Sequence, residues 1–407
     1  VLVLKQCTKK YPMLYYYAAY YEEKMGEDEA AKKSLDKAES CAFDYCFPNK
    51  LDDIAVLTFA IENGCKKKAP YYLGNLFYDK LQWKKSVELW EMSKKTDDTF
   101  SIVHRNLALA YYNKMGDSKA AKRELEKAFS LNRKDARIFL ELDQLYKKLG
   151  YSFKERLAKY DEDPSLAESR DDLYIEYITL MNMCGEYERA YRCIMGRRFH
   201  PWEGGEGKIT TQYTISLLEM AKQCLASEKY EQAEKLLKKA LVYPENLGEG
   251  KLEGTKDNHL FYHLGLALEA QGKHDEAKTC FETATIGTDE PAGAMYYNDQ
   301  PADMILYQGL AFEKLGKTRE AKSRFYRLID YGEQHLNDEG KIEYFAVSLP
   351  DFLIFDEDYT KKNRAHCCYL MALGNIGLQN REKAAEFLNE ALEIEPSHMM
   401  ATLYQKQ

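Results

Sequence analysis

The chain has 407 residues and a formal net charge of −8, from 58 Lys and Arg against 66 Asp and Glu. This acidic balance leaves no surplus of cations for phosphate groups, which argues against nucleic acid or an anionic membrane as a partner. Gly (23) and Pro (10) are few for this length, which favours helices over a turn-rich β fold. Tyrosine is abundant, with 32 Tyr against 17 Phe and 3 Trp, and these rings combine an apolar body with a polar tip.

The cellular setting is expected to be the cytoplasm. No run of about 18 apolar residues predicts a membrane-spanning helix. The first residues have neither the basic start nor the long apolar core of a signal peptide, and the chain reads as part of something longer. Its ten cysteines are scattered without a C-x-x-C pair, which indicates reduced thiols.

A period of 34 residues organises the sequence. Counting Gly74 as position 8 of a unit puts Phe77 at position 11, Ser86 at 20 and Ser93 at 27, which resembles the tetratricopeptide repeat (TPR). Small residues at positions 8, 20 and 27 let neighbouring helices approach, and the aromatic ring fills the groove between them. The same frame recurs in seven further segments: 18–38, 108–128, 185–194, 221–244, 265–284, 309–325 and 372–396.

The frame therefore predicts an all-α, TPR-like α-solenoid built from antiparallel helix pairs, right-handed by resemblance to that repeat. With a degenerate pair near 135–160, about nine units can be traced. The charged, proline-containing turn at Asp161–Ser165 is the best internal boundary. We expect an N-terminal repeat block over 1–163 and a C-terminal block over 164–407 in one continuous superhelix.

Long connections interrupt the period in the C-terminal block. They are expected at 196–210, 243–258, 286–302 and 330–361, all on one edge of the solenoid. Three contain the word Glu-Gly-Lys followed by an apolar residue, beginning at Glu206, Glu249 and Glu339. Regular recurrence of this word indicates a common role for it in the three loops.

Two interpretations of the repeated word stay open. Glycine can supply a left-handed turn while Glu and Lys cap helix ends. Alternatively, the loops form a polar rim that binds a partner or a ligand. The candidate loop residues are His200, Trp202, Glu203, Glu206, Lys208, Glu249, Lys251, Glu339 and Lys341.

The concave face is a second candidate site. TPR arrays bind ligands through positions 2, 5, 9, 12 and 13 of the first helix of each unit, and rigid, hydrogen-bonding tyrosine rings suit protein recognition there. About half of these rings could instead pack between repeats. The candidate groove residues are Tyr15, Tyr71, Asn75, Tyr78, Arg105, Tyr112, Tyr262 and Tyr369.

No catalytic constellation is apparent, and we expect no enzymatic activity from this chain, no cofactor and no metal. His259 and His263 are four residues apart, but the glutamate of a zinc-protease motif is missing between them. The stretch 199–208 does not fit a phosphate-binding loop, because Trp202 stands where Gly is needed and Ile209 where Ser or Thr is needed.

The loop sequences carry a more specific resemblance. Segments 199–208, 243–252, 299–304 and 345–353 resemble the C-terminal TPR half of a family of large bacterial proteins. The resemblance implies an N-terminal all-β, mutarotase-like sandwich domain of unknown function. We therefore expect an interaction scaffold whose partner is a protein or its own β domain. The alternative is that the loop edge contributes to a carbohydrate-binding or carbohydrate-processing site of a larger parent protein.

Overall fold

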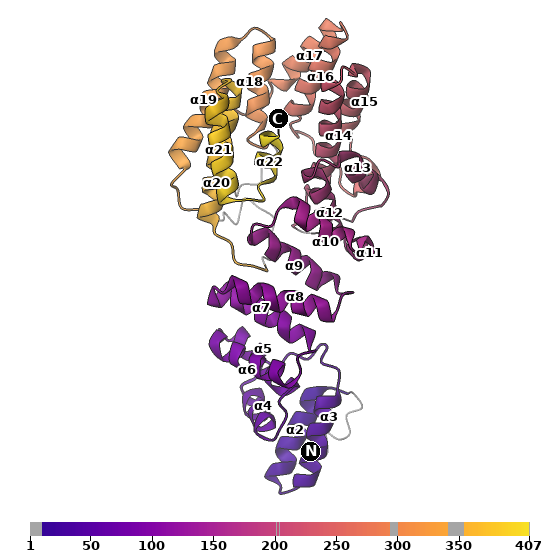
Figure 1. Cartoon of the computed structure of the whole chain (residues 1–407), viewed down its shortest axis with the longest axis vertical. Coiled ribbons are helices and arrows are strands. Elements are labelled where there is room, and N and C mark those ends of the chain that lie inside the picture. Colours follow the sequence, from indigo (N-terminus) through magenta and orange to yellow (C-terminus); the bar gives the residue numbers. More distant parts are fainter. Residues whose placement is uncertain (1–9, 201, 203, 294–299, 341–353, 407) are drawn as a thin grey trace. The chain divides into compact units, whose positions relative to one another are not determined.

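The computed structural model describes residues 10–200, 202, 204–293, 300–340 and 354–406. All regular structure in these ranges is helical, with no strand among them (Figure 1). The chain divides into two compact units: unit 1 is 1–145 with 354–356, and unit 2 is 146–353 with 357–407. The division falls within helix α9, whereas the repeat-block boundary at residue 163 stays a prediction.

Unit 1 consists of helix pairs stacked in chain order. Helices α2 and α3, α5 and α6, and α7 and α8 pack as the three expected pairs, with α4 inserted after the first. Their bounds are α2 (Pro12–Lys24), α3 (Asp28–Ser40), α4 (Leu51–Glu62), α5 (Lys68–Asp79), α6 (Trp83–Thr96), α7 (Ser101–Met115), α8 (Ser118–Leu131) and α9 (Ala136–Lys148).

Unit 2 contains the other five expected pairs, from α12 with α13 to α20 with α21. A bilayer-crossing helix is not found in the described part of the chain. The bounds are α10 (Phe153–Asp161), α11 (Pro164–Glu168), α12 (Asp171–Met183), α13 (Tyr187–Met195), α14 (Lys208–Ala226), α15 (Tyr230–Ala240), η1 (Glu245–Leu247), α16 (Asn258–Ala270), α17 (His274–Ala284), α18 (Met304–Lys314), α19 (Thr318–His335), α20 (Tyr359–Gly377), α21 (Arg381–Ile394) and α22 (Met399–Gln405).

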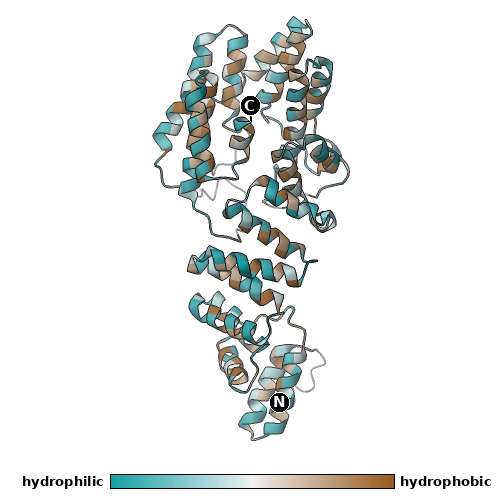
Figure 2. Cartoon of the chain, viewed as in Figure 1, coloured by the Kyte–Doolittle hydropathy of each residue, from teal (hydrophilic) through white to brown (hydrophobic). Residues whose placement is uncertain are grey.

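Close helix approach in the α16–α17 and α18–α19 pairs agrees with the repeat frame. A Cβ atom added at Gly309 would lie 2.2 Å from the Phe325 ring, and one at Gly265 would lie 2.5 Å from the Phe281 ring. Both glycines occupy position 8, where the frame requires a small residue. The helices carry hydrophobic and hydrophilic residues along their length (Figure 2), as expected for helices that bury one face against a neighbour.

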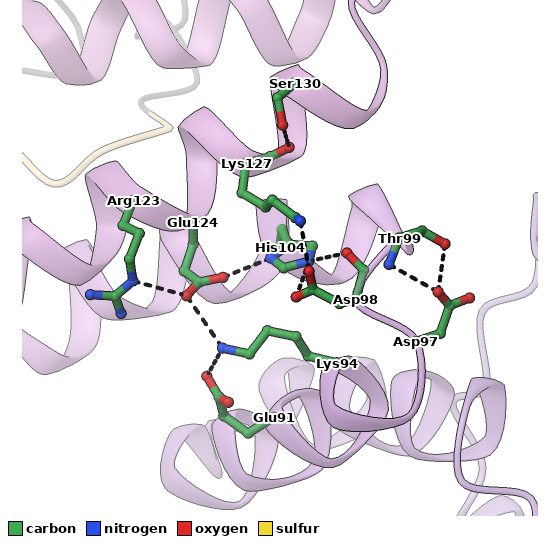
Figure 3. A network of polar contacts seen from close by, with 10 residues as sticks. All are labelled: Glu91, Lys94, Asp97, Asp98, Thr99, His104, Arg123, Glu124, Lys127 and Ser130. Atoms are coloured by element: carbon green, nitrogen blue, oxygen red, sulfur yellow. Dashed lines mark hydrogen bonds and ion pairs between the residues drawn. The ribbon is translucent and has the colours of Figure 1, made fainter.

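A buried polar network joins α6, α7 and α8 in unit 1 (Figure 3). His104 is 2% exposed, and its Nδ1 lies 2.7 Å from Oε2 of Glu124. Lys94 donates to the other carboxylate oxygen of Glu124 at 3.3 Å. Burial by itself raises the pKa of Glu124, but the hydrogen bonds from His104 and Lys94 outweigh it and lower that pKa.

The C-terminal helix α22 is enclosed by the first helices of several pairs in unit 2 (Figure 1). Leu403 packs in a cluster with Met183 of α12 and Ile215 of α14. Tyr404 donates a hydrogen bond to the Tyr307 hydroxyl of α18 at 2.8 Å. Helix α22 therefore fills part of the inner face of unit 2.

Candidate functional site

Two of the predicted long loops are tied together by backbone hydrogen bonds. These loops are 196–207, between α13 and α14, and 241–257, between α15 and α16. The Phe199 amide donates to the Asn246 carbonyl at 2.8 Å. The Gly207 amide donates to Oε2 of Glu249 at 2.8 Å, which connects the first two Glu-Gly-Lys words directly. The two loops therefore form one edge of unit 2.

The first word is anchored within its own loop. Glu206 accepts a hydrogen bond from the Gly204 amide at 2.8 Å, while Gly207 has a φ of 76° and precedes the first residue of α14. Lys208, expected in the loop, is that first helical residue, because the left-handed Gly207 starts the helix there. Its ammonium lies 5.9 Å from the Trp202 ring centroid.

His200 and Trp202 are both held by neighbouring residues. The backbone amide of His200 donates to Asp171 Oδ2 at 2.9 Å, and His200 Nδ1 lies 3.1 Å from the same oxygen. The half-buried Trp202 ring packs so closely on Gly205 that an added Cβ would lie 2.2 Å from it. His200 is thus exposed, while the Trp202 ring packs on Gly205 of its own loop.

The second word caps the end of a helix. Lys251 donates to the Leu241 carbonyl at 3.0 Å, at the C-terminus of α15, and pairs with Asp257 at 2.6 Å. Burial raises the pKa of Glu249, and the hydrogen bond from Gly207 acts against that shift. In the third word Glu339 is exposed. Glu203 and Lys341 lie outside the described residues.

The predicted groove residues of unit 1 divide into core and surface positions. Tyr71 is buried, with its ring centroid 5.1 Å from that of Phe100, and the half-buried Tyr15 packs against the same core. The half-buried Tyr78 ring lies 5.4 Å from the Trp90 ring. These tyrosines therefore pack within a repeat or between neighbouring repeats.

The polar groove residues pair with one another or with a neighbouring repeat. Oδ1 of Asn75 accepts from Asn106 at 3.0 Å and from the Trp90 indole at 3.1 Å. Arg105 makes a bidentate ion pair with the fully buried Glu141, at 2.6 and 2.5 Å. This pair joins α7 to α9.

Tyr112 lies beside a segment that is far away in sequence. Its ring packs edge-on against Phe355, with 5.0 Å between centroids, and Phe355 is 2% exposed. The neighbouring Asn113 donates to the Ile354 carbonyl at 2.8 Å and accepts from the Asp356 amide at 2.9 Å. We call Tyr112, Asn113 and Lys114 the α7 docking surface.

In unit 2, Tyr262 and Tyr369 join an aromatic cluster. The Tyr262 and Tyr307 ring centroids are 5.9 Å apart, and those of Tyr369 and Tyr404 are 6.0 Å apart. Tyr369 is 4% exposed, and burial raises its pKa well above the usual range. The concave positions of unit 2 therefore face a cluster that α22 completes.

A cavity of about 320 Å³ adjoins this cluster. Residues from α14, α16, α18 and α22 line it, and a second cavity of about 610 Å³ shares several of its lining residues. Asp303 lines both cavities and is 7% exposed. Burial raises the pKa of this carboxyl group to about 6, although its own backbone amide and Lys222 act in the opposite direction.

The sequence analysis missed both Asn113 and Asp303 as site residues. Asn113 occupies position 13 of its unit, one of the positions assigned to the groove, whereas the predicted groove residues occupy positions 5, 9 and 12. Asp303 lies in the segment 299–304, whose sequence indicated only the family resemblance. A single carboxylate forms no motif, so its spacing to other residues could not identify it as a site residue. Within the described ranges, no group of three His, Cys, Asp or Glu residues could hold a metal ion.

Models of the tetratricopeptide repeat match four segments of the chain. One matches residues 106–135, 259–285 and 365–398, and a second matches residues 303–331. Each of the four matched segments contains one of the predicted repeat segments. The chain therefore carries tetratricopeptide repeats, in agreement with the frame read from its sequence.

Solved structures of repeat proteins are also similar. A tetratricopeptide repeat protein from Parabacteroides merdae is 14% identical, with 76% of this chain and 98% of that chain covered and a TM-score of 0.32. The Naa15/Naa10 structure bound to HypK-THB is 12% identical, with 97% of this chain and 60% of that chain covered and a TM-score of 0.37. YrrB, described as a TPR protein with an unusual peptide-binding site, is 18% identical. The match covers 63% of this chain and 100% of that chain, with a TM-score of 0.22.

Proposed function

We propose that this protein is a non-enzymatic scaffold that binds a short segment of a partner protein on the α7 docking surface. The observation that carries the proposal is the pair of hydrogen bonds between the Asn113 amide and the backbone of Ile354 and Asp356. A side-chain amide offers a donor and an acceptor together, so it can pair with a backbone C=O and N–H of one extended chain.

Side-chain contacts add selectivity to this backbone recognition. Phe355 is buried against Tyr112, and the Lys114 ammonium pairs with Asp356 at 3.1 Å. The surface thus favours an aromatic residue followed by an acidic one. Burying a phenylalanine side chain is worth about 2–3 kcal/mol, while the half-exposed ion pair contributes less than about 1 kcal/mol.

A competition experiment tests the proposal. In the full chain, Phe355→Ala should weaken the internal segment and free the α7 docking surface. A fluorescent peptide with the sequence Leu-Ile-Phe-Asp-Glu should then bind this variant, measured by fluorescence anisotropy, and bind the unaltered chain more weakly. No binding to the folded variant would refute the proposal.

Two controls distinguish specific recognition of the peptide from non-specific binding. Adding Asn113→Ala to the variant should weaken peptide binding about tenfold, because two hydrogen bonds to the peptide backbone are lost. Asn132→Ala, the same substitution at an exposed position of unit 1, should leave binding unchanged. A peptide with Ala in place of Phe should not bind.

The edge formed by loops 196–207 and 241–257 is a second contact surface in this proposal, and the β domain implied by the family resemblance is its proposed partner. The bonds from Phe199 to Asn246 and from Gly207 to Glu249 support it, because they hold the two loops as one surface. Replacing both loops with short Gly-Ser linkers should abolish capture of the separately expressed β domain. The carbohydrate alternative gains no support here, since the carboxylates of Glu206 and Glu249 each accept a backbone amide.

A further inference from the structure

We propose that the cavity in unit 2 binds an organic cation, an ammonium group carried on an apolar stem, with the Asp303 carboxylate as its counter-ion. This site lies in a different unit from the α7 docking surface and does not depend on peptide binding there.

The first observation is that the Asp303 carboxylate is buried and has no side-chain hydrogen bond or ion pair among the residues that the structure describes, its own backbone amide aside. It precedes α18, but its side chain does not cap that helix. No ion pair or side-chain hydrogen bond to it is found within the described ranges, although it is only 7% exposed. An unpaired carboxylate is costly to bury, so its retention beside a cavity points to a ligand that supplies the missing positive charge.

A second, independent observation concerns neutral polar groups around the same space. The Tyr369 hydroxyl is buried, lines the adjoining cavity with Asp303, and has no hydrogen-bond partner in the described part of the chain. Nδ1 of His259, which lines the first cavity, is also unpartnered within those residues. Burial lowers the pKa of His259 to about 3, so the neutral ring can accept a hydrogen bond from an ammonium group.

The walls of the cavity match the stem of such a ligand. Its apolar lining includes Ile215, Leu218, Met304 and Met400. The ring of Tyr307 lines it as well, and aromatic faces attract organic cations through their quadrupole. A cavity of about 320 Å³ has room for a small arylalkylamine or for a lysine side chain.

Other ligand classes fit the cavity less well. Two lysines line it, Lys222 and Lys256, but Lys222 already pairs with Glu219 at 2.7 Å. An anion would also meet the carboxylates of Glu219, Asp257 and Asp303, which line the same cavity. Hard metal ions need six or more oxygen ligands, whereas the described residues offer no three-ligand group.

Calorimetric titration of the full chain with 2-phenylethylamine and with its uncharged analogue 2-phenylethanol tests the proposal. The amine should bind at least about tenfold more tightly than the alcohol, because only the amine forms a charge-assisted hydrogen bond with Asp303. Asp303→Asn should remove this difference. Asp275→Asn, the same substitution at an exposed position on α17, should preserve it.

A second arm distinguishes a free amine from a protein-borne one. A short peptide with one lysine and blocked termini is compared with the same peptide carrying an acetylated lysine. Binding of the unmodified peptide but not of 2-phenylethylamine would assign the ammonium group to a protein partner. Equal affinity for the amine and the alcohol, or binding of neither the amine nor the lysine peptide, would overturn the proposal, provided that thermal unfolding shows the chain to be folded.

Discussion

The side-chain amide of Asn113 donates to the backbone carbonyl of Ile354 at 2.8 Å, although the two residues are 241 positions apart in the chain. The same side chain accepts from the Asp356 amide, so one asparagine bonds to two backbone groups of the segment 354–356. A repeat surface that holds its own chain in this way has the chemistry to hold another, which is why the proposed function rests on this pair.

Removing the Phe355 ring should release the internal segment without unfolding unit 1. Phe355→Ala deletes the buried contact with Tyr112, worth about 2–3 kcal/mol, while the helix pairs keep their own interfaces. Hydrogen exchange at the Asp356 amide should therefore accelerate at least about tenfold. Phe47→Ala removes a ring that is 70% exposed and should leave that exchange rate unchanged. Unaltered exchange in Phe355→Ala would show that the segment is held by other contacts.

The buried carboxylate of Glu124 should be a large contributor to the stability of unit 1. Glu124→Ala leaves His104 and Lys94 without their shared acceptor and should lower the free energy of unfolding by about 2–4 kcal/mol at pH 7, measured by urea denaturation. Glu88→Ala, at an exposed position on α6, should cost less than about 0.5 kcal/mol.

The contribution of Glu124 should also depend on pH. Its pKa is lower in the folded chain than its ordinary value of 4.5, so its stabilising effect is complete above pH 4.5 and is lost as the pH falls through the folded pKa. The difference between the unaltered chain and Glu124→Ala should therefore shrink in acid. A difference that stays constant down to pH 3 would contradict this assignment.

The repeat frame predicts which glycines tolerate a methyl group. Gly309→Ala should lower the free energy of unfolding by about 1–3 kcal/mol, because the new Cβ would lie 2.2 Å from the Phe325 ring. Gly250→Ala is the matched control, since no atom lies within 4 Å of a Cβ there. Thermal unfolding of the two variants compares them directly. Equal melting temperatures would mean that the α18–α19 pair can open to accept the methyl group.

Asp303→Asn should stabilise the chain at neutral pH. Because the pKa of Asp303 is raised from 3.8 to about 6 in the folded chain, its ionisation opposes folding. The free energy of unfolding of the unaltered chain, relative to that of the variant, is therefore highest below pH 3.8. It falls as the pH rises from 3.8 through about 6.

At pH 7 the variant should thus be more stable by about 2–3 kcal/mol, and at pH 3.5 the difference should vanish. Urea denaturation across this range gives the measurement, with Asp275→Asn as the exposed control. A variant less stable than the unaltered chain at pH 7 would show that the Asp303 charge is satisfied within the protein. If Asp303→Asn gains stability and loses amine binding, Asp303 contributes to ligand binding at a cost in stability.

The sequence by itself determined the repeat architecture of this protein. Gly309 and Phe325, or Gly265 and Phe281, are separated by a constant 16 residues, and that local rule specifies where two helices meet whatever lies elsewhere in the chain. The eight helix pairs could be located for the same reason. Local spacing also identified the Glu-Gly-Lys words, but not that Glu249 of one word would bind Gly207 of another.

Only the tertiary structure decided which of the candidate residues contact one another and which other residues they contact. Tyr71 and Tyr369 carry the spacing of groove residues, yet they pack into the cores of their units, since a tyrosine ring suits either environment. Asn113 acquires its role from residues 354–356, and Asp303 from the α22 helix and the cavity beside it. These contacts join residues that are far apart in sequence. The repeat period predicts contacts only within a repeat and between adjacent repeats, so it could not predict them.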